Sequence, residues 1–277
     1  MNLILDELSI KYDNLINTLS KYVIEGIVIA FSGGVDSGFL LLSAEEARQK
    51  FGGKVFALTT NSESLPKNDR IDVENFIKKF GIKHIWKDSF EIYSNEYIKN
   101  DNLRCYHCKT ELFKIAKEVA KENECKWIAY GYNSSDTTDI RPGHRAAIEN
   151  NILYPLAESN FTKSEIRELM RRKNISLADK PSSPCLSSRI MTNVLITRNK
   201  LKDIDDLENI LRRAGLKVFR LRHHEIEQKK ILRLETTHEE MLLAFKLKDL
   251  LIPEAKLRGY KWVTIDLEGY KQGGGNL

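Results

Sequence analysis

Short apolar runs alternate, over roughly the first 180 residues, with longer segments in which apolar positions recur every three or four residues. The run GIVIAF, residues 26–31, is typical of a buried strand because it is short, apolar and rich in β-branched side chains. The pattern predicts strands over residues 27–31, 54–59, 82–86 and 127–130, and helices over residues 3–19, 37–50, 67–80, 105–123 and 163–173. Strands that alternate with helices indicate a parallel sheet with helices on both faces.

The order of elements changes after DKPSSP, residues 179–184, a segment rich in proline and serine. Beyond it the pattern predicts a helix over residues 198–213, strands over 216–222 and 230–235, a helix over 238–251 and a strand over 260–266. We therefore expect an α/β fold, with a parallel-sheet domain over residues 1–180 and a smaller α+β domain over residues 181–277. The motif TKSE, residues 162–165, is a capping box that opens the last predicted helix of the first domain.

A glycine-rich turn, SGGVDS at residues 32–37, lies between the first predicted strand and the helix that follows it. Glycines allow positive φ and close approach of the backbone to a ligand, and free N–H groups at a helix start bind anions. The turn therefore predicts a phosphate cradle. The usual P-loop pattern, in which a lysine follows the second glycine, is absent, so an ordinary kinase or GTPase is not expected.

Composition sets limits on the partners. The chain has 277 residues, 42% of them hydrophobic and 30% charged, with a formal net charge of +5. This mildly basic balance suits a small anionic substrate and does not require nucleic acid. No apolar run reaches the length of a membrane span, and the N-terminus predicts an amphipathic helix and not a signal peptide. We expect a cytoplasmic protein with no membrane partner.

Three of the four cysteines form a pattern that points to chemistry. Cys105 and Cys108 make a C-x-x-C at a predicted helix start, which favours the thiolate form, and Cys185 lies in a proline-bounded loop. Three thiolates can hold a 4Fe–4S cluster with one iron left open, and that iron can bind an extra sulfide. A redox pair, purely structural thiols, or a zinc site that includes His107 are alternatives. Cys125 has no partner spacing and is interpreted as structural.

The SGGVDS turn in its strand–turn–helix context resembles the signature of the PP-loop ATP pyrophosphatases, which have an adenine nucleotide alpha hydrolase-like fold. The resemblance implies that the loop binds the pyrophosphate end of ATP with Mg²⁺ and that AMP is transferred to a substrate oxygen. GYNSSD, residues 131–136, resembles the second nucleotide motif of that group. The implied ATP-binding residues are Ser32, Gly33, Gly34, Asp36, Ser37, Gly131, Asn133 and Asp136.

Three further stretches, PSSPCLSSRI, RLRHH and DLEGYKQGG, resemble the LarE family of sulfur transferases, and the likeness covers nearly the whole chain. It implies a small-molecule nucleotide substrate, pyridinium-3,5-dicarboxylate mononucleotide. One of its carboxylates is adenylated and its oxygen is replaced by sulfur, giving the thiocarboxylate of a nickel-pincer nucleotide. It also implies a homo-oligomer, a hexamer in the family.

The family contains two kinds of sulfur chemistry. Members with a single cysteine, which matches Cys185, give up its sulfur and retain dehydroalanine. Members with three cysteines use a 4Fe–4S cluster as a sulfur carrier, recharged by sulfide or another sulfur donor. Because Cys105 and Cys108 accompany Cys185, this chain resembles the second kind. A sacrificial Cys185 beside two vestigial thiols stays open as the alternative.

The resemblance also assigns residues to the substrate. Arg220 and Arg222 alternate on a predicted strand, so both point the same way, and two neighbouring arginines suit a phosphate. Arg189 is implied as a third ligand of phosphate or carboxylate. Glu208 and Glu239 match acidic positions that the family uses near the phosphate, through a metal ion; a solvated strand face is the alternative for the arginines.

Other functions compete with this one. A tRNA thiolase shares the SGGxDS loop and catalytic cysteines, but no RNA-binding motif is visible here. A synthetase that uses ammonia needs no such set of cysteines, and no glutaminase segment is present. A non-catalytic ATP-binding or iron–sulfur sensor would bind these ligands without releasing pyrophosphate.

Overall fold

The computed structural model describes residues 2–136 and 142–271. Its strands are β1 (Ile27–Ala30), β2 (Val55–Asn61), β3 (His84–Asp88), β4 (Trp127–Tyr130), β5 (Phe219–Ile226), β6 (Lys229–Thr236) and β7 (Tyr260–Ile265). Its α-helices are α1 (Asn2–Ile24), α2 (Val35–Phe51), α3 (Lys67–Phe80), α4 (Asn95–Ile98), α5 (Arg104–Glu122), α6 (Pro142–Glu149), α7 (Pro155–Glu158), α8 (Lys163–Arg172), α9 (Arg198–Arg213), α10 (Met241–Lys246) and α11 (Lys248–Leu257). None of these helices combines the length and the apolar character that a membrane span requires.

The first sheet has the strand order β3-β2-β1-β4, and every neighbouring pair is parallel. Ile29 in the central strand pairs with Ala57 on one side and with Ala129 on the other. The predicted α/β fold with a parallel sheet is therefore confirmed. Because all strands point the same way, their carboxyl ends meet at one edge, where ligands bind in folds of this kind.

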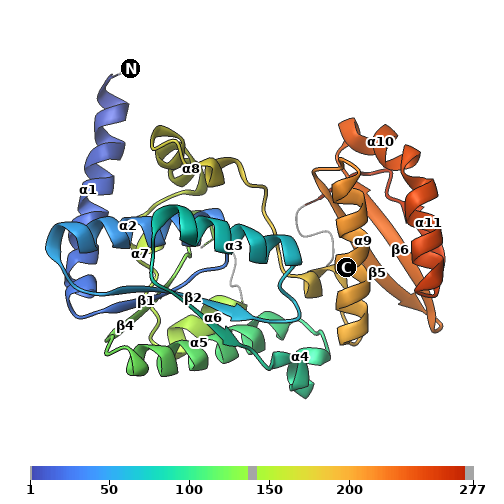
Figure 1. Ribbon diagram of the computed structural model, residues 1–277, viewed down its shortest axis with the longest axis horizontal. Helices are drawn as coiled ribbons and strands as arrows, with labels where there is room; N and C mark the ends of the chain where they lie inside the picture. The colour runs from blue at the N-terminus through green and yellow to red at the C-terminus, as the bar shows by residue number, and fades with distance from the viewer. Residues whose placement is uncertain (1, 137–141, 272–277) are drawn as a thin grey trace. The chain divides into compact units, whose positions relative to one another are not determined.

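Alternate residues of β1 enter two different apolar cores. Ile27 and Ile29 pack into a cluster formed with α1, α2, α3 and α8, whereas Val28 and Ala30 pack into a cluster formed with α5 and α6. Figure 1 shows α2 and α3 on one side of this sheet and α5 on the other. A strand that is covered on both faces needs apolar residues at every position, which explains the unbroken run in the sequence.

The described chain divides into two compact units. The first comprises residues 1–61, 68–89 and 106–183, and the second comprises residues 62–67, 90–105 and 184–277. In the second unit, β5 and β6 are antiparallel, β6 and β7 are parallel, and the core face of the sheet packs against α9, α10 and α11. Two short segments from the N-terminal half of the chain thus belong to the second unit, which a linear division of the sequence does not anticipate.

Several element boundaries differ from the predicted ones for identifiable reasons. The strand predicted from residue 216 begins at Phe219, because the carboxylate of Glu240 binds the N–H groups of Lys217 and Val218. The strand predicted from residue 82 begins at His84, because the N–H of Ile82 donates to Ile77 and completes the end of α3. The helix predicted over residues 238–251 is a 3₁₀ turn followed by α10 and α11.

The capping box at the start of α8 is present as predicted. The backbone N–H of Glu165 donates to Thr162 Oγ1, and the Glu165 carboxylate accepts from the Thr162 N–H at 2.8 Å. We predict that Thr162→Ala lowers the free energy of unfolding by about 1 kcal/mol because the helix loses its N-cap oxygen. Chemical denaturation measures this change. Thr162→Ser retains the hydroxyl and is the control; a Thr162→Ser loss equal to that of Thr162→Ala contradicts the capping role.

Candidate functional site

The glycine turn connects β1 to α2 and is held by its own polar groups. Gly33 has φ of +70°, and a Cβ there would lie 2.9 Å from the Val73 side chain, so only glycine fits without strain. Ser37 Oγ donates to the Gly34 carbonyl at 3.2 Å and accepts from the Ser32 N–H at 3.3 Å. The turn therefore has a defined shape, and α2 starts at Val35 directly behind it.

The second predicted nucleotide motif lies directly against this turn. Gly131 follows β4, and a Cβ there would lie 2.5 Å from the backbone nitrogen of Ser37. Asn133 Nδ2 donates to Asp136 Oδ2 at 2.9 Å, and Ser135 Oγ accepts from the N–H of Lys163 at 3.1 Å. The structure thus brings the SGGVDS and GYNSSD motifs together. Residues 137–139, which continue the second motif, lie outside the described residues.

A cavity of about 170 Å³ opens at the glycine turn. It is lined by Ser32, Gly33, Gly34, Val35, Asp36, Asp69, Lys163, Arg167, Lys180, Pro181, Ser182 and Ser183. Three of these side chains are cations, and two of the lining residues are glycines at a helix start. This combination suits a polyanion such as a pyrophosphate group, because backbone N–H groups and cations both favour negative charge.

The three cations were not predicted from the sequence, although one of them, Lys163, carried a signal. Lys163 occupies the first turn of α8, where a positive charge interacts unfavourably with the helix dipole. A lysine at this position therefore does not stabilise the helix, which indicates another role. Lys180 lies in the DKPSSP segment interpreted as a linker. Its Nζ donates to the Gly33 carbonyl at 3.1 Å and pairs with Asp69 at 2.9 Å.

Asp36 has the character of a cation ligand. One of its carboxylate oxygens pairs with Lys163, while Oδ1 is buried and has no hydrogen-bond partner among the described residues. Burial raises the pKa of Asp36, the cation of Lys163 opposes this, and the carboxylate of Asp136 adds to it. Two carboxylates that repel each other beside a phosphate cradle fit a Mg²⁺ ion, which prefers oxygen ligands.

Two of the three cysteines predicted to be functional lie beside one guanidinium in the second unit. Arg104 Nη2 lies 3.7 Å from Cys105 Sγ, and Arg104 Nη1 donates to the Ser187 carbonyl at 3.1 Å and to Asn100 Oδ1 at 2.6 Å. Burial disfavours the charged form of Arg104, but the neighbouring Cys185 and Cys105 outweigh it and raise its pKa. Arg104 was not predicted as a site residue.

The third of these cysteines, Cys108, lies one turn after Cys105 on α5, whose observed start at Arg104 agrees with the predicted helix start. None of the three forms a disulfide bond within the described residues. Within residues 2–136 and 142–271, no three His, Cys, Asp or Glu side chains converge as ligands of a single metal ion. Cys125 is buried near Gly26, where a Cβ would lie 3.0 Å from its sulfur, and burial raises its pKa.

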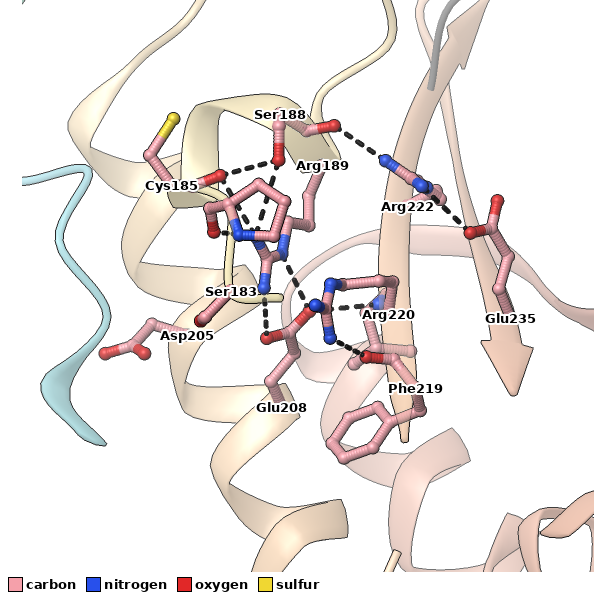
Figure 2. Close-up of polar contacts among 12 residues, drawn as sticks. Ser183, Cys185, Ser188, Arg189, Asp205, Glu208, Phe219, Arg220, Arg222 and Glu235 are labelled. Carbon is pink, nitrogen blue, oxygen red and sulfur yellow. Dashed lines mark hydrogen bonds and ion pairs between the residues drawn. The ribbon is translucent and has the colours of Figure 1, made fainter. Parts of the chain in front are cut away.

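Buried arginines occupy the face of the second sheet that lies opposite its apolar core (Figure 2). The exposed fractions of Arg189, Arg220 and Arg222 are 1%, 7% and 6%. Arg222 Nη1 donates to the Ser188 carbonyl at 2.8 Å, whereas its Nε is buried and has no hydrogen-bond partner among the described residues. Burial lowers the pKa of Arg220, and the cations Arg189 and Arg222 add to this effect.

The acidic residues of this unit have different surroundings. Glu208 is buried, and its carboxylate accepts from Arg189 Nε at 3.1 Å, from Arg189 Nη2 at 3.3 Å and from the Leu221 N–H at 3.1 Å. Glu239 is exposed in the 3₁₀ turn that precedes α10. Glu208 therefore has the contacts of a structural ion pair, and its predicted role beside Glu239 near the phosphate stays a prediction.

Comparisons with known proteins agree with this geometry. The chain is 34% identical to an uncharacterized protein of Synechocystis over 248 residues, which is 89% of this chain and 90% of the relative. It is 24% identical to the pyridinium-3,5-bisthiocarboxylic acid mononucleotide synthase of Lactiplantibacillus plantarum over 251 residues, or 90% of this chain and 88% of that enzyme. No protein-family profile matches the chain.

A more distant similarity covers only about half of the chain. Over 169 residues, 56% of this chain and 40% of the relative, the chain is 31% identical to the argininosuccinate synthase of Pyrococcus furiosus. The two named relatives are both synthases. Together with a glycine turn that closes on a cationic cavity at the carboxyl edge of a parallel sheet, these similarities show that the chain belongs to the LarE family of PP-loop enzymes.

Proposed function

We propose that this enzyme uses ATP to adenylate a carboxylate of pyridinium-3,5-dicarboxylate mononucleotide and then replaces an oxygen of that carboxylate with sulfur. The observation that carries the proposal is the cavity at the glycine turn, where Lys163, Arg167 and Lys180 surround a helix start. The printed name of the L. plantarum relative, a synthase of the bisthiocarboxylic acid mononucleotide, supports the identity of the product.

The residues of the first unit bind and orient the leaving group. A carboxylate oxygen is a poor leaving group. Adenylation of the carboxylate releases pyrophosphate in the first step and makes AMP the leaving group when sulfur attacks in the second. As pyrophosphate departs, the N–H groups of the turn and the cations of Lys163 and Lys180 stabilise the negative charge that develops on it. Asp36, with its free Oδ1, and Asp136 would hold Mg²⁺, which supplies further stabilisation of that charge.

Three cysteines would supply the sulfur chemistry. Cys105, Cys108 and Cys185 would hold a 4Fe–4S cluster, since none of the three is in a disulfide and the first and last lie near the guanidinium of Arg104. When bound, such a cluster would supply sulfide obtained from an external donor. A sacrificial Cys185, and a PP-loop thiolase that acts on tRNA, are the alternatives that the experiments below distinguish.

Arg220 and Arg222 would bind the phosphate of the nucleotide substrate. Both project from the same face of β5, and the buried, unpaired Nε of Arg222 offers a donor for which a phosphate oxygen is a suitable acceptor. Arg189, also predicted as a phosphate ligand, pairs with Glu208 and would support this site. A hexamer and a cytoplasmic location, both expected from the sequence, belong to the same proposal.

The first prediction from this proposed function concerns ATP. Purified enzyme should release pyrophosphate from ATP only when the carboxylated nucleotide is present. Lys180→Gln should lower this rate about tenfold or more, a cost of about 1.4 kcal/mol, because the cavity loses a cation. Lys173→Gln is the matched control, since Lys173 pairs with Glu46 and does not line the cavity. Pyrophosphate release that requires tRNA instead of the nucleotide contradicts the proposal, and absence of any release favours a sensor.

The second prediction concerns the substrate phosphate. Arg222→Gln should raise KM for the nucleotide about tenfold with a smaller effect on kcat, because it removes a binding contact that persists through the reaction. Arg233→Gln, which also loses a contact to Glu235 but keeps Arg222, should have a weaker effect. Steady-state kinetics on the substrate and on its dephosphorylated form provide the test. Equal losses on both forms would mean that Arg222 does not recognise the phosphate.

The third prediction concerns the sulfur carrier. Enzyme purified without oxygen should contain about four irons per chain. Cys105→Ala should lose this iron and Cys125→Ala should retain it, because Cys125 is buried away from the proposed ligand set. Iron and sulfide assays measure the content, and mass spectrometry follows Cys185 through several turnovers. Stoichiometric conversion of Cys185 to dehydroalanine would overturn the cluster and support the sacrificial route.

A further inference from the structure

The second unit brings together two segments whose cysteines, Cys105 and Cys185, are 80 positions apart in the sequence. Cys105 begins helix α5, and Cys185 precedes the 3₁₀ turn of residues Leu186–Arg189. The main chain after Cys185 is fixed, because its carbonyl accepts from the Ser188 N–H at 3.0 Å, from Ser188 Oγ at 2.7 Å and from Arg189 Nη1 at 3.0 Å. None of these contacts uses the sulfur, which Figure 2 shows on the other side of the residue.

One side chain connects the two cysteine segments. Arg104 uses Nη1 for the Ser187 carbonyl, two residues after Cys185, while Nη2 faces the sulfur of Cys105 at 3.7 Å. The same Nη1 is oriented by the Oδ1 of Asn100 at 2.6 Å. Asn100 is fully buried, and its Nδ2 donates to the carbonyls of Met191 at 2.9 Å and Val194 at 3.1 Å. Both terminal nitrogens of the Arg104 guanidinium therefore have defined neighbours, two oxygens at Nη1 and the Cys105 sulfur at Nη2.

We propose that Arg104 is a positioning residue that holds the thiols of Cys105 and Cys185 beside its guanidinium. Both thiols can then take part in transfer of the same sulfur atom. The role of these thiols in sulfur transfer rests on the proposed function, whereas their placement by Arg104 does not. A lysine cannot replace Arg104 fully, because an ammonium lacks the planar fork that reaches the Ser187 carbonyl and the Cys105 sulfur together.

The test measures placement directly, with no ATP, substrate or cluster. In full-length chain stripped of iron and carrying Cys108→Ser and Cys125→Ser, only Cys105 and Cys185 remain to react with the short bifunctional reagent dibromobimane. The parent should form the intramolecular cross-link, Arg104→Gln should form it at least about tenfold more slowly, and Arg104→Lys should be intermediate. Labelling with monobromobimane, which needs each thiol alone, should still reach both cysteines in every variant.

Two controls separate placement from general loosening of the unit. Arg198→Gln removes a surface arginine of the same unit that pairs with Glu63, and it should cross-link like the parent. Tyr97→Phe removes another side-chain contact to this loop, a 2.5 Å hydrogen bond to Ser187 Oγ, and should also stay near the parent rate. Cross-linking of Arg104→Gln at the parent rate, or equal losses in Arg104→Gln and Tyr97→Phe, would overturn the proposal.

A failure of this inference can be told apart from a failure of the proposed function. If the parent cross-links as expected but releases no pyrophosphate with the nucleotide, the placement holds and the reaction is different. If pyrophosphate is released and sulfur is transferred while the parent does not cross-link, the reaction holds and the role of Arg104 is wrong.

Discussion

The close approach of two main-chain segments at the carboxyl edge of the first sheet is the constraint on which the nucleotide site depends. A single added carbon at Gly131 would lie 2.5 Å from the nitrogen of Ser37, so the turn after β4 rests directly on the start of α2. That contact fixes the distance between the two motifs more tightly than a side-chain contact, because neither backbone can rotate away. The positions of Asp36, Asp136 and Lys163 all follow from it.

The fold could be predicted from the sequence because its signals are local. An unbroken apolar run predicts a strand that is buried on both faces. The capping residues Thr162 and Glu165 lie only three positions apart, so the start of α8 can be recognised from a short sequence motif. The boundaries that moved did so where a distant group intervened. The Glu240 carboxylate, for example, takes two N–H groups that the pattern had assigned to β5.

The site was predicted only in part, for the same physical reason. Glycines and cysteines in short motifs are visible one segment at a time, whereas Lys180 and Arg104 gain their meaning from partners far along the chain. Lys180 lies in a segment that resembles a linker by composition, yet its ammonium contacts the Gly33 carbonyl. Arg104 precedes the C-x-x-C and is indistinguishable, in sequence, from any surface arginine; only the Ser187 carbonyl and the two neighbouring sulfurs give it a role.

The way in which Cys185 is fastened has a consequence for the lifetime of the protein. Its carbonyl accepts from three donors, and none of them contacts the sulfur, so these three hydrogen bonds do not require the thiol. With the role proposed above for Arg220 and Arg222, a chain that had lost this sulfur would still bind the nucleotide without converting it. Under the sacrificial alternative, spent molecules would act as inhibitors of fresh ones until they were degraded.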